Sequence, residues 1–204
     1  IKTDGTVGIV TQTTDTTASA GTPAVFESAA TTHIAAAYDS TNGKVVIAYR
    51  DDGNNEYGTA VVGTVSGTSI SFGTAVVYES ATTSYTSATY DSSNGKVVIS
   101  YRDHGNSQRG TAIVGTVSGT SISFGTAVVI DSTPGVSHIS ATYDSTNNKV
   151  VIAYRDEDNS NYGKAVVGTV SGTSISFGSA TTFESGQSGY ISAIYDSANG
   201  KVVI

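Results

Sequence analysis

The stretch Tyr38–Asp51, YDSTNGKVVIAYRD, occurs four times along the chain, the last time in shortened form. The later copies read YDSSNGKVVISYRD from Tyr90, YDSTNNKVVIAYRD from Tyr143 and YDSANGKVVI from Tyr195. They begin at intervals of 52, 53 and 52 residues, and the extra residue lies near Pro134. Self-similarity at such a period is typical of stacked supersecondary units. We therefore predict a repeat protein and not one irregular domain.

The periodicity inside one unit is that of β-strands. Asn42-Gly43 is a residue pair favoured in tight hairpins, because both positions tolerate positive φ. No segment places apolar residues at helical spacing. In the first complete unit the strands are predicted at residues 33–38, 44–50, 58–65 and 69–79, the last with a bulge or bend at Gly73.

Consecutive apolar residues mark the second and third strands of the unit. Residues 45–48 and 60–62 are unbroken apolar runs, whereas a strand with one solvated face would alternate. These strands are therefore predicted to be covered on both faces. Face-to-face packing of like sheets around an axis provides this cover, and it predicts an all-β, four-bladed β-propeller with four antiparallel strands per blade. A linear stack is the competing arrangement, and it needs capping segments that the sequence does not display.

The two ends of the sequence each match half a unit. Residues 5–28 match the second half, and residues 190–204 match the first half. We predict a single propeller domain over residues 1–204 in which the two halves form the fourth blade. Pairing within one molecule closes a ring, which we expect, whereas the same pairing between molecules can build a filament. The expected boundaries are a half-blade at 1–28, repeats at 29–80, 81–132 and 133–185, and a half-blade at 186–204.

Composition and charge narrow the class of protein. Charged residues are 13% of the 204 residues, about half the usual share. The net charge of −7 argues against nucleic acid and anionic membrane as partners, and no stretch approaches the ~20 apolar residues of a membrane span. Low charge, uniform units and a first residue other than Met favour an extracellular or virion-surface location, as part of a longer chain. Cysteine is absent, so burial must stabilise the fold.

A second repeated phrase, GTVSGTSISFG, forms the predicted hairpin between the third and fourth strands. The strand order and this hairpin resemble the repeats of sialidase-type β-propellers, called BNR or Asp-box repeats. The Asp and Trp of the box are absent here, and Ser and Gly occupy the turn. Near-identical tandem units are also similar to repeats of phage fibre and bacterial surface proteins, and neither resemblance implies catalytic residues. The turns lie at 66–73, 118–125 and 171–178, with Phe72, Phe124 and Phe177 in the place of the aromatic anchor.

Arginine recurs in the YRD sequence of every complete unit. Three arginines together can bind a carboxylate, but equivalent positions in successive blades are expected to lie far apart. Each arginine is therefore expected to pair with the aspartate that follows it. The expected pairs are Arg50 with Asp51, Arg102 with Asp103, and Arg155 with Asp156.

The loops after YRD are the least alike part of the unit and read DDGNNEYG, DHGNSQRG and DEDNSNYG. Asp156, Asp158 and Ser160 alternate as at the start of a calcium loop, but the distal Glu of such a loop is absent. A solvated turn is the simpler interpretation. His104 and Arg109 occur only in the second loop.

The first position of each first strand alternates between His and Tyr. In a closed ring of four blades these side chains face one another around one mouth, with His opposite His. Aromatic rings with polar tips bind sugars, a pair of His can bind a metal, and filling the rim without any ligand is the third alternative. We take them as candidate ligand-binding residues, and predict no metal, cofactor or catalytic site. They are His33, Tyr85, His138 and Tyr190.

Catalysis needs different groups that converge on one point, and near-identical units do not readily provide such a point. We therefore expect a non-enzymatic structural or adhesive repeat protein of an extracellular assembly, such as a surface fibre or a phage appendage. Its expected partners are further copies of itself or a larger surface assembly. A lectin-like glycan-binding propeller is the alternative, and a sialidase-type glycosidase is the least favoured class.

Overall fold

The structure is a computed structural model that describes residues 5–7, 10–12 and 18–204 of the chain. It is all-β with antiparallel pairing. Among the described residues the one helical element is a short 3-10 turn, η1 (His104–Asn106). No helix in that part of the chain is long and apolar enough to cross a membrane.

Three complete units of four strands follow one another along the chain. In each unit the first three strands pair in sequence order. The fourth strand is broken into two segments, and both segments pair with the third strand. The first unit contains β5 (Thr31–Asp39), β6 (Lys44–Asp51), β7 (Tyr57–Ser66), β8 (Ser69–Phe72) and the start of β9 (Val76–Asp91). The second contains the rest of β9, β10 (Lys96–Asp103), β11 (Arg109–Ser118), β12 (Ser121–Phe124) and β13 (Val128–Val129). The third contains β14 (Val136–Asp144), β15 (Lys149–Asp156), β16 (Tyr162–Ser171), β17 (Ser174–Phe177) and β18 (Thr181–Glu184).

The break in the fourth strand confirms the bend predicted at Gly73. The strand stops after Phe72, the Gly73 N–H donates to Val62 O at 2.9 Å, and pairing with β7 resumes at Val76. A Cβ at Gly73 would lie 1.9 Å from Thr120 O in the turn of the next unit. Glycine is therefore required here because the backbone of the following unit approaches too closely for any side chain.

Strand β9 connects the first two units without a loop. Its residues 76–82 pair with β7, and its residues 83–91 pair with β10. One continuous strand is thus the fourth strand of one unit and the first strand of the next. The corresponding passage from β13 to β14 is interrupted by residues 130–135, where the sequence contains its extra residue.

The described N-terminal residues are built as the third and fourth strands of a unit. Strand β1 (Thr6–Val7) pairs with β4 (Ala24–Val25), and β2 (Val10–Gln12) pairs with β3 (Ala18–Ala20). The pair Thr6↔Val25 repeats the register of Thr59↔Val77 in the first complete unit. The half-unit predicted from the sequence therefore has the strand pairing of strands three and four.

The C-terminal hairpin is built as the first two strands of a unit. Strands β19 (Ile194–Asp196) and β20 (Lys201–Val203) pair in the register Ile194↔Val203, which repeats Ala37↔Val46 of β5 and β6. Among the described residues no strand pairing joins β20 to β1 or β2. Closure of a ring through these two half-units stays a prediction.

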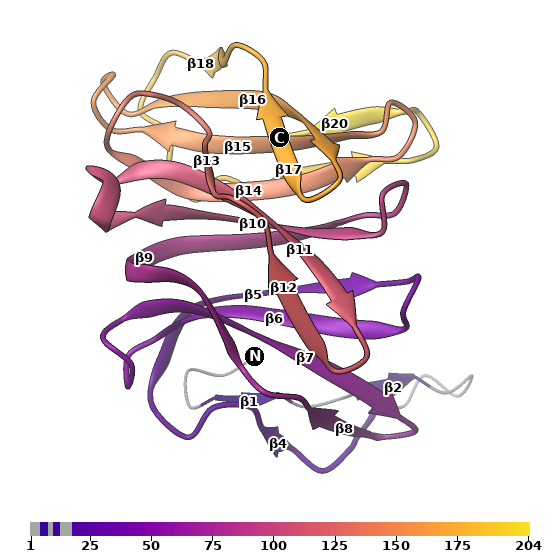
Figure 1. Ribbon diagram of the computed structural model, residues 1–204. Coiled ribbons are helices and arrows are strands. Elements are labelled where there is room, and N and C mark those ends of the chain that lie inside the picture. The colour runs from indigo at the N-terminus through magenta and orange to yellow at the C-terminus, as the bar shows by residue number, and fades with distance from the viewer. Residues whose placement is uncertain (1–4, 8–9, 13–17) are drawn as a thin grey trace.

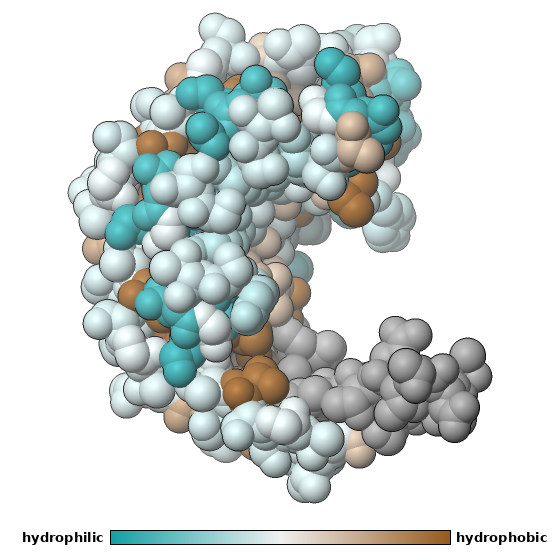
Figure 2. Space-filling view, turned by 90° about the vertical axis from the view of Figure 1, so that its right-hand side faces the viewer, coloured by the Kyte–Doolittle hydropathy of each residue, from teal (hydrophilic) through white to brown (hydrophobic). Residues whose placement is uncertain are grey.

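The units are stacked in sequence order, from the N-terminal strands at the bottom to β18–β20 at the top (Figure 1). Turned by 90°, the described residues form an open arc (Figure 2). The first strands β5, β9, β14 and β19 contact one another from unit to unit. They lie on the concave side, and strands three and four lie on the convex side (Figures 1 and 2).

The core lies between the units and not inside a single sheet. Most of the predicted apolar runs are buried: Val46, Ile47 and Ala48 are inaccessible and residues 60–62 are at most 1% exposed, whereas Val45 is only partly buried. The buried residues form three clusters, each of which spans the space between neighbouring units. In the first two units strands two and three are therefore covered on both faces, as the unbroken apolar runs predicted. In the third unit β16 is not, since Val167 is 48% exposed.

Candidate functional site

The four candidate ligand-binding residues lie side by side along the concave side of the arc. The ring centroids are 5.5 Å apart for His33 and Tyr85, 5.1 Å for Tyr85 and His138, and 5.2 Å for His138 and Tyr190. We call His33, Tyr85, His138 and Tyr190 the aromatic ladder. The described arc thus brings all four together, but as a row in which Tyr85 separates the two histidines and not as facing pairs.

Each residue of the aromatic ladder has a left-handed backbone conformation. The φ angles are 50° at His33, 52° at Tyr85, 48° at His138 and 55° at Tyr190. Register shifts accompany the first three, since the pairing of the first strand with the second is interrupted at these positions. Such bulges change the direction of a side chain relative to the strand. Positive φ at a non-glycine residue costs about 1–3 kcal/mol, and such residues occur in turns and cluster at functional sites.

Backbone hydrogen bonds determine the tautomer of two histidines. The Tyr85 N–H donates to His33 Nδ1 at 3.1 Å, and the Tyr190 N–H donates to His138 Nδ1 at 3.4 Å. A nitrogen that accepts carries no proton, so the neutral rings hold their proton on Nε2. Burial, followed by the nearby Arg50 for His33 and Arg155 for His138, lowers the pKa of both imidazoles. Both rings are therefore favoured in the neutral form.

The recurrent arginines do not pair with the aspartates that follow them, so that prediction was wrong. Arg50 Nε lies 2.7 Å from Asp52 Oδ1, one residue further along the loop. Asp51 instead accepts the Gly53 N–H at 3.0 Å and is buried. The reason is the alternation of side chains along a strand: Arg50 and Asp51 point to opposite faces.

One carboxylate connects two arginines across a junction between units. Glu157 Oε2 lies 3.1 Å from Arg102 Nη2, and Glu157 Oε1 lies 2.7 Å from Arg155 Nη2. Arg102 also bonds to Gln108, and its guanidinium lies 5.8 Å from the centre of the Tyr85 ring. Arg102 and Arg155 therefore do meet at one point, contrary to the expected separation, but an acid of the chain itself occupies that point.

The loop that resembles the start of a calcium site is arranged around a lysine. Asp156 Oδ2 lies 2.6 Å from Lys164 Nζ, and Asp156 Oδ1 accepts the Asn159 N–H at 3.2 Å. The ammonium group of Lys164 bonds to the Asp156 carboxylate and therefore occupies the place that a bound calcium ion would need. In the described ranges no group of three or more His, Cys, Asp or Glu side chains is placed to bind a metal.

The residues found only in the second loop have contacts of their own. His104 Nε2 lies 2.8 Å from Ser84 Oγ. Arg109 donates to Asn106 Oδ1 at 3.1 Å and to Ser132 O at 3.1 Å. These contacts hold the loop against its own unit.

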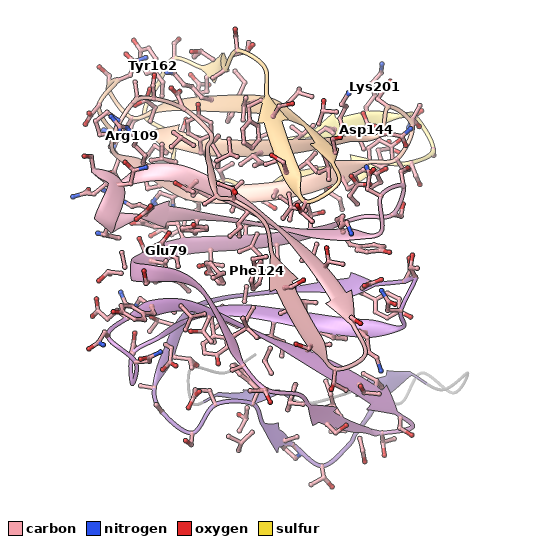
Figure 3. The ribbon with its side chains drawn as sticks, in the orientation of Figure 1. Glu79, Arg109, Phe124, Asp144, Tyr162 and Lys201 are labelled. Atoms are coloured by element: carbon pink, nitrogen blue, oxygen red, sulfur yellow. The ribbon has the colours of Figure 1, made fainter. Side chains whose placement is uncertain are left out.

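Sequence reasoning missed a second row of polar contacts, at the opposite rim of the arc. The tyrosines of the second, third and fourth YD sequences reach the turn of the preceding unit: Tyr90 donates to Thr41 at 2.5 Å, Tyr143 donates to Ser93 at 2.6 Å, and Tyr195 bonds to Thr146. Figure 3 labels Asp144 and Lys201 on this rim. It labels Arg109 and Tyr162 on the opposite rim, where the loops after the YRD sequences lie. The sequence feature that could have predicted these contacts is the strict repetition of YDS, followed by Thr or Ser in the three complete units.

The described surface forms no enclosed pocket over these groups. Among the described residues, many side chains capable of acid–base chemistry make contacts within or between units. A comparison of the chain with protein-family models finds no match, and a comparison with curated proteins finds none either.

Proposed function

We propose that the chain is a non-enzymatic structural or adhesive repeat protein of an extracellular assembly, such as a surface fibre or a phage appendage. The observation that carries this proposal is one contact that recurs from junction to junction: a buried tyrosine bonds to a carboxylate of the preceding unit, as Tyr49 does to Glu27, Tyr101 to Glu79 and Tyr154 to Asp131. Polar groups that could perform chemistry in an enzyme here connect one unit to the next. A chain built in this way resists separation of its units, which is what an assembly component needs.

The contacts of the first strands illustrate this repetition. The Ala141 N–H donates to Ser87 Oγ at 3.0 Å, and the Ala193 N–H donates to Ser140 Oγ at 2.9 Å. Between the first two units this bond is absent, because Ala35 stands at the position of Ser87 and Ser140. The tyrosine contacts at the turns occur at all three of these junctions. Hydrogen bonds of this kind contribute about 1 kcal/mol each.

Antibodies against the purified chain test the location and the role. Gold-labelled antibodies applied to the intact native cells or particles should decorate the surface or an appendage, and negative-stain images should show the labelled structure. Label that appears only after the cells are opened would contradict the proposal.

We also infer that the units are propeller-type blades and that the two half-units belong to one fourth blade. Two features support this: like sheets pack face to face with their first strands toward a common concave side (Figure 2), and the half-units have complementary strand pairing. If the N-terminal and C-terminal half-units pair to form the fourth blade, small-angle scattering should give the curve of a ring-like particle. A curve that fits an elongated rod at every concentration would contradict the blade geometry.

A lectin-like activity is the second candidate, and the aromatic ladder favours it. The ladder presents imidazole and phenol groups in alternation, and Tyr190 at its end is almost fully exposed. Aromatic rings pack on the apolar faces of sugars while their polar tips bond to hydroxyls. The strained backbone at all four positions points to a selected side-chain direction.

Glycan arrays test this second candidate. Replacement of Tyr85 and Tyr190 by Ala should weaken any binding and leave the melting temperature nearly unchanged. The matched control is Tyr38→Ala, which removes an exposed tyrosine at the opposite end of β5. A sharp fall in melting temperature without any bound glycan would show that the ladder serves packing only.

A further inference from the structure

A tyrosine, two acids and a fourth side chain recur together where neighbouring units meet. Between the first and second units they are Tyr101, Glu79, Asp103 and Thr111, and we call this set the Thr111 junction. The next junction has the equivalent residues of the repeat, and we call them the Lys164 junction. They are Tyr154, Asp131, Asp156 and Lys164. The two sets differ in chemical class at one position, where a hydroxyl stands in the first and an ammonium group in the second.

The strand register places three side chains of the Thr111 junction on one face of the sheet. Tyr101 of β10 lies directly opposite Thr111 of β11, and Asp103 follows Tyr101 by two residues. Opposite residues of an antiparallel pair share a face, and so do residues two apart on one strand. The Tyr101 hydroxyl bonds to Glu79 Oε2 at 3.0 Å, so this face is turned toward the preceding unit. Figure 3 labels Glu79 at the boundary between the two units.

The Lys164 junction indicates what this arrangement of acids binds. Lys164 Nζ lies 2.6 Å from Asp156 Oδ2 and 3.6 Å from Asp131 Oδ2. Burial alone would raise the pKa of Asp131, but the hydrogen bond from Tyr154 and the charge of Lys164 are among the contacts that lower it. One positive charge between the two carboxylates therefore stabilises both in their ionised form.

The Thr111 junction has the two acids but no lysine beside them. Asp103 is 7% exposed, and its Oδ1 accepts the Asn106 N–H at 3.1 Å. In Asp156 the same oxygen accepts a backbone N–H, while Oδ2 bonds to the ammonium group. Burial first, and then the charge of Asp103, raises the pKa of Glu79. Two carboxylates that face each other in a poorly solvated place favour a cation between them.

The hydroxyl of Thr111 is a second observation, and it is independent of the acids. Thr111 is 2% exposed, and its Oγ1 is buried without a hydrogen-bond partner among the described residues. The equivalent hydroxyl of Thr59 donates to Tyr57 O at 3.5 Å. A buried hydroxyl without a partner is costly. Thr111 therefore provides an oxygen for a ligand on the same side of the sheet as the two carboxylates.

We propose that Glu79, Asp103 and Thr111 bind a calcium ion between the first and second units. Carboxylate and hydroxyl oxygens are hard donors, and Ca²⁺ takes about six to eight oxygen ligands, which can include backbone carbonyls and water. The ion connects the units at the Thr111 junction as the ammonium group of Lys164 does at the next one. The donor set has two acids and one hydroxyl, so it is smaller than a group of three acidic or histidine side chains. This inference does not depend on the proposed role of the chain.

A proton shared by Glu79 and Asp103 is the other way to remove the repulsion between them. It would leave the Thr111 hydroxyl without a partner, whereas an ion uses that oxygen as well. The unpartnered hydroxyl therefore favours the ion, and the experiment separates the two.

Thermal unfolding with and without calcium is the first test. About 10 mM calcium chloride should raise the melting temperature of the chain by about 3–10 °C relative to the same buffer with a chelator, as expected for an affinity in the range of about 10⁻⁴–10⁻³ M. Sodium chloride of the same ionic strength controls for screening and should not reproduce the rise.

Thr111→Lys is the decisive variant, because it gives the Thr111 junction the ammonium group that the next junction already has. The variant should fold, should be at least as stable as the unaltered chain without calcium, and should lose the calcium response. The matched control Ser121→Lys adds the same charge at an exposed position of β12 and should keep the full response.

Isothermal titration calorimetry measures binding directly. Thr111→Lys should bind one calcium ion fewer than the unaltered chain. Glu79→Gln keeps an oxygen that can accept the bond from Tyr101 but removes one charge, and it should weaken the binding of that ion at least about 10-fold. This variant decides the question if Thr111→Lys does not fold.

The proposal is overturned if calcium leaves the melting temperature unchanged, if sodium chloride has the same effect, or if Thr111→Lys or Glu79→Gln binds calcium like the unaltered chain. A chain that ignores calcium but loses stability between pH 5 and pH 7 in a manner that Glu79→Gln abolishes would identify the shared proton instead.

Discussion

The hydroxyl of Tyr154 lies 2.6 Å from Asp131 Oδ2 and donates a hydrogen bond to it across the junction between the second and third units. Tyr101 reaches Glu79 at 3.0 Å across the preceding junction, and Tyr49 reaches Glu27 at 3.5 Å. All three tyrosines are inaccessible to solvent. Burial first, and the nearby carboxylate after it, raises the pKa of all three phenols. The phenols therefore stay protonated and remain donors.

Tyr154→Phe is predicted to destabilise the protein by about 1–2 kcal/mol, because it removes this bond and leaves Asp131 with fewer partners in a buried place. Urea denaturation measures the free energy of unfolding. Tyr38→Phe is the control, since Tyr38 is exposed and should tolerate the loss of its hydroxyl. Equal effects of the two changes would show that the buried bond contributes nothing.

Val98→Ala is predicted to reduce the free energy of unfolding by about 1–3 kcal/mol, because it leaves a cavity between the second and third units. Val98 is inaccessible, and so is Val46 in the first unit. Val77→Ala at the exposed outer edge should cost less than about 0.5 kcal/mol. A loss of only a few tenths at Val98 would argue that the strand faces solvent and that the stacked-unit structure is wrong.

Gly125→Ala is predicted to destabilise the protein by about 1–3 kcal/mol, since the added methyl group overlaps the backbone of the next unit. Gly178→Ala at the equivalent position should be nearly neutral for the isolated molecule, because the site is open. Thermal unfolding of both variants at low concentration provides the measurement. Similar melting temperatures for the two would contradict the close approach at Gly125.

The three histidines are predicted to make the protein less stable as the pH falls below about 6.5. Burial, and then the arginines nearby, lowers the pKa of His33, His104 and His138 in the folded state. The unfolded chain therefore takes up these protons first, and stability decreases between the unfolded and the folded pKa values. Protonation also removes the acceptor at Nδ1 of His33 and His138.

Denaturation curves at pH 7.5, 6.5 and 5.5 measure this dependence for the unaltered protein and for His138→Gln. Asp51 and Glu79 act in the opposite sense, because burial raises their pKa values and favours their protonation in the folded state. The difference in pH dependence between the unaltered protein and His138→Gln gives the contribution of the His138 imidazole. An identical slope in both would exclude His138 as a contributor.

Much of the fold could be predicted from the repeated phrases. The strand positions, the hairpin at Asn42-Gly43, the break at Gly73 and the burial of residues 46–48 on both faces follow from residue types and their local order. The matching of the two ends to half-units also follows, since the register of β1–β4 and of β19–β20 repeats that of complete units.

The partners of the charged side chains were predictable only in part. Adjacent residues in a strand point to opposite faces, so Arg50 bonds to Asp52 and not to Asp51. Arg102 finds Glu157 in another unit, 55 residues away in the sequence. No rule about neighbouring residues predicts this pair, because the contact depends on how the sheets of two units pack against each other.

The sequence by itself determined the unit, its strands, its turns and the residues that are buried between units, because these depend on interactions within about fifty residues that the chain repeats. The tertiary structure decided how the units are curved and which side chains meet across the junctions. These features depend on the angle between neighbouring sheets. That angle results from the packing of many side chains at once, and no single stretch of sequence encodes it.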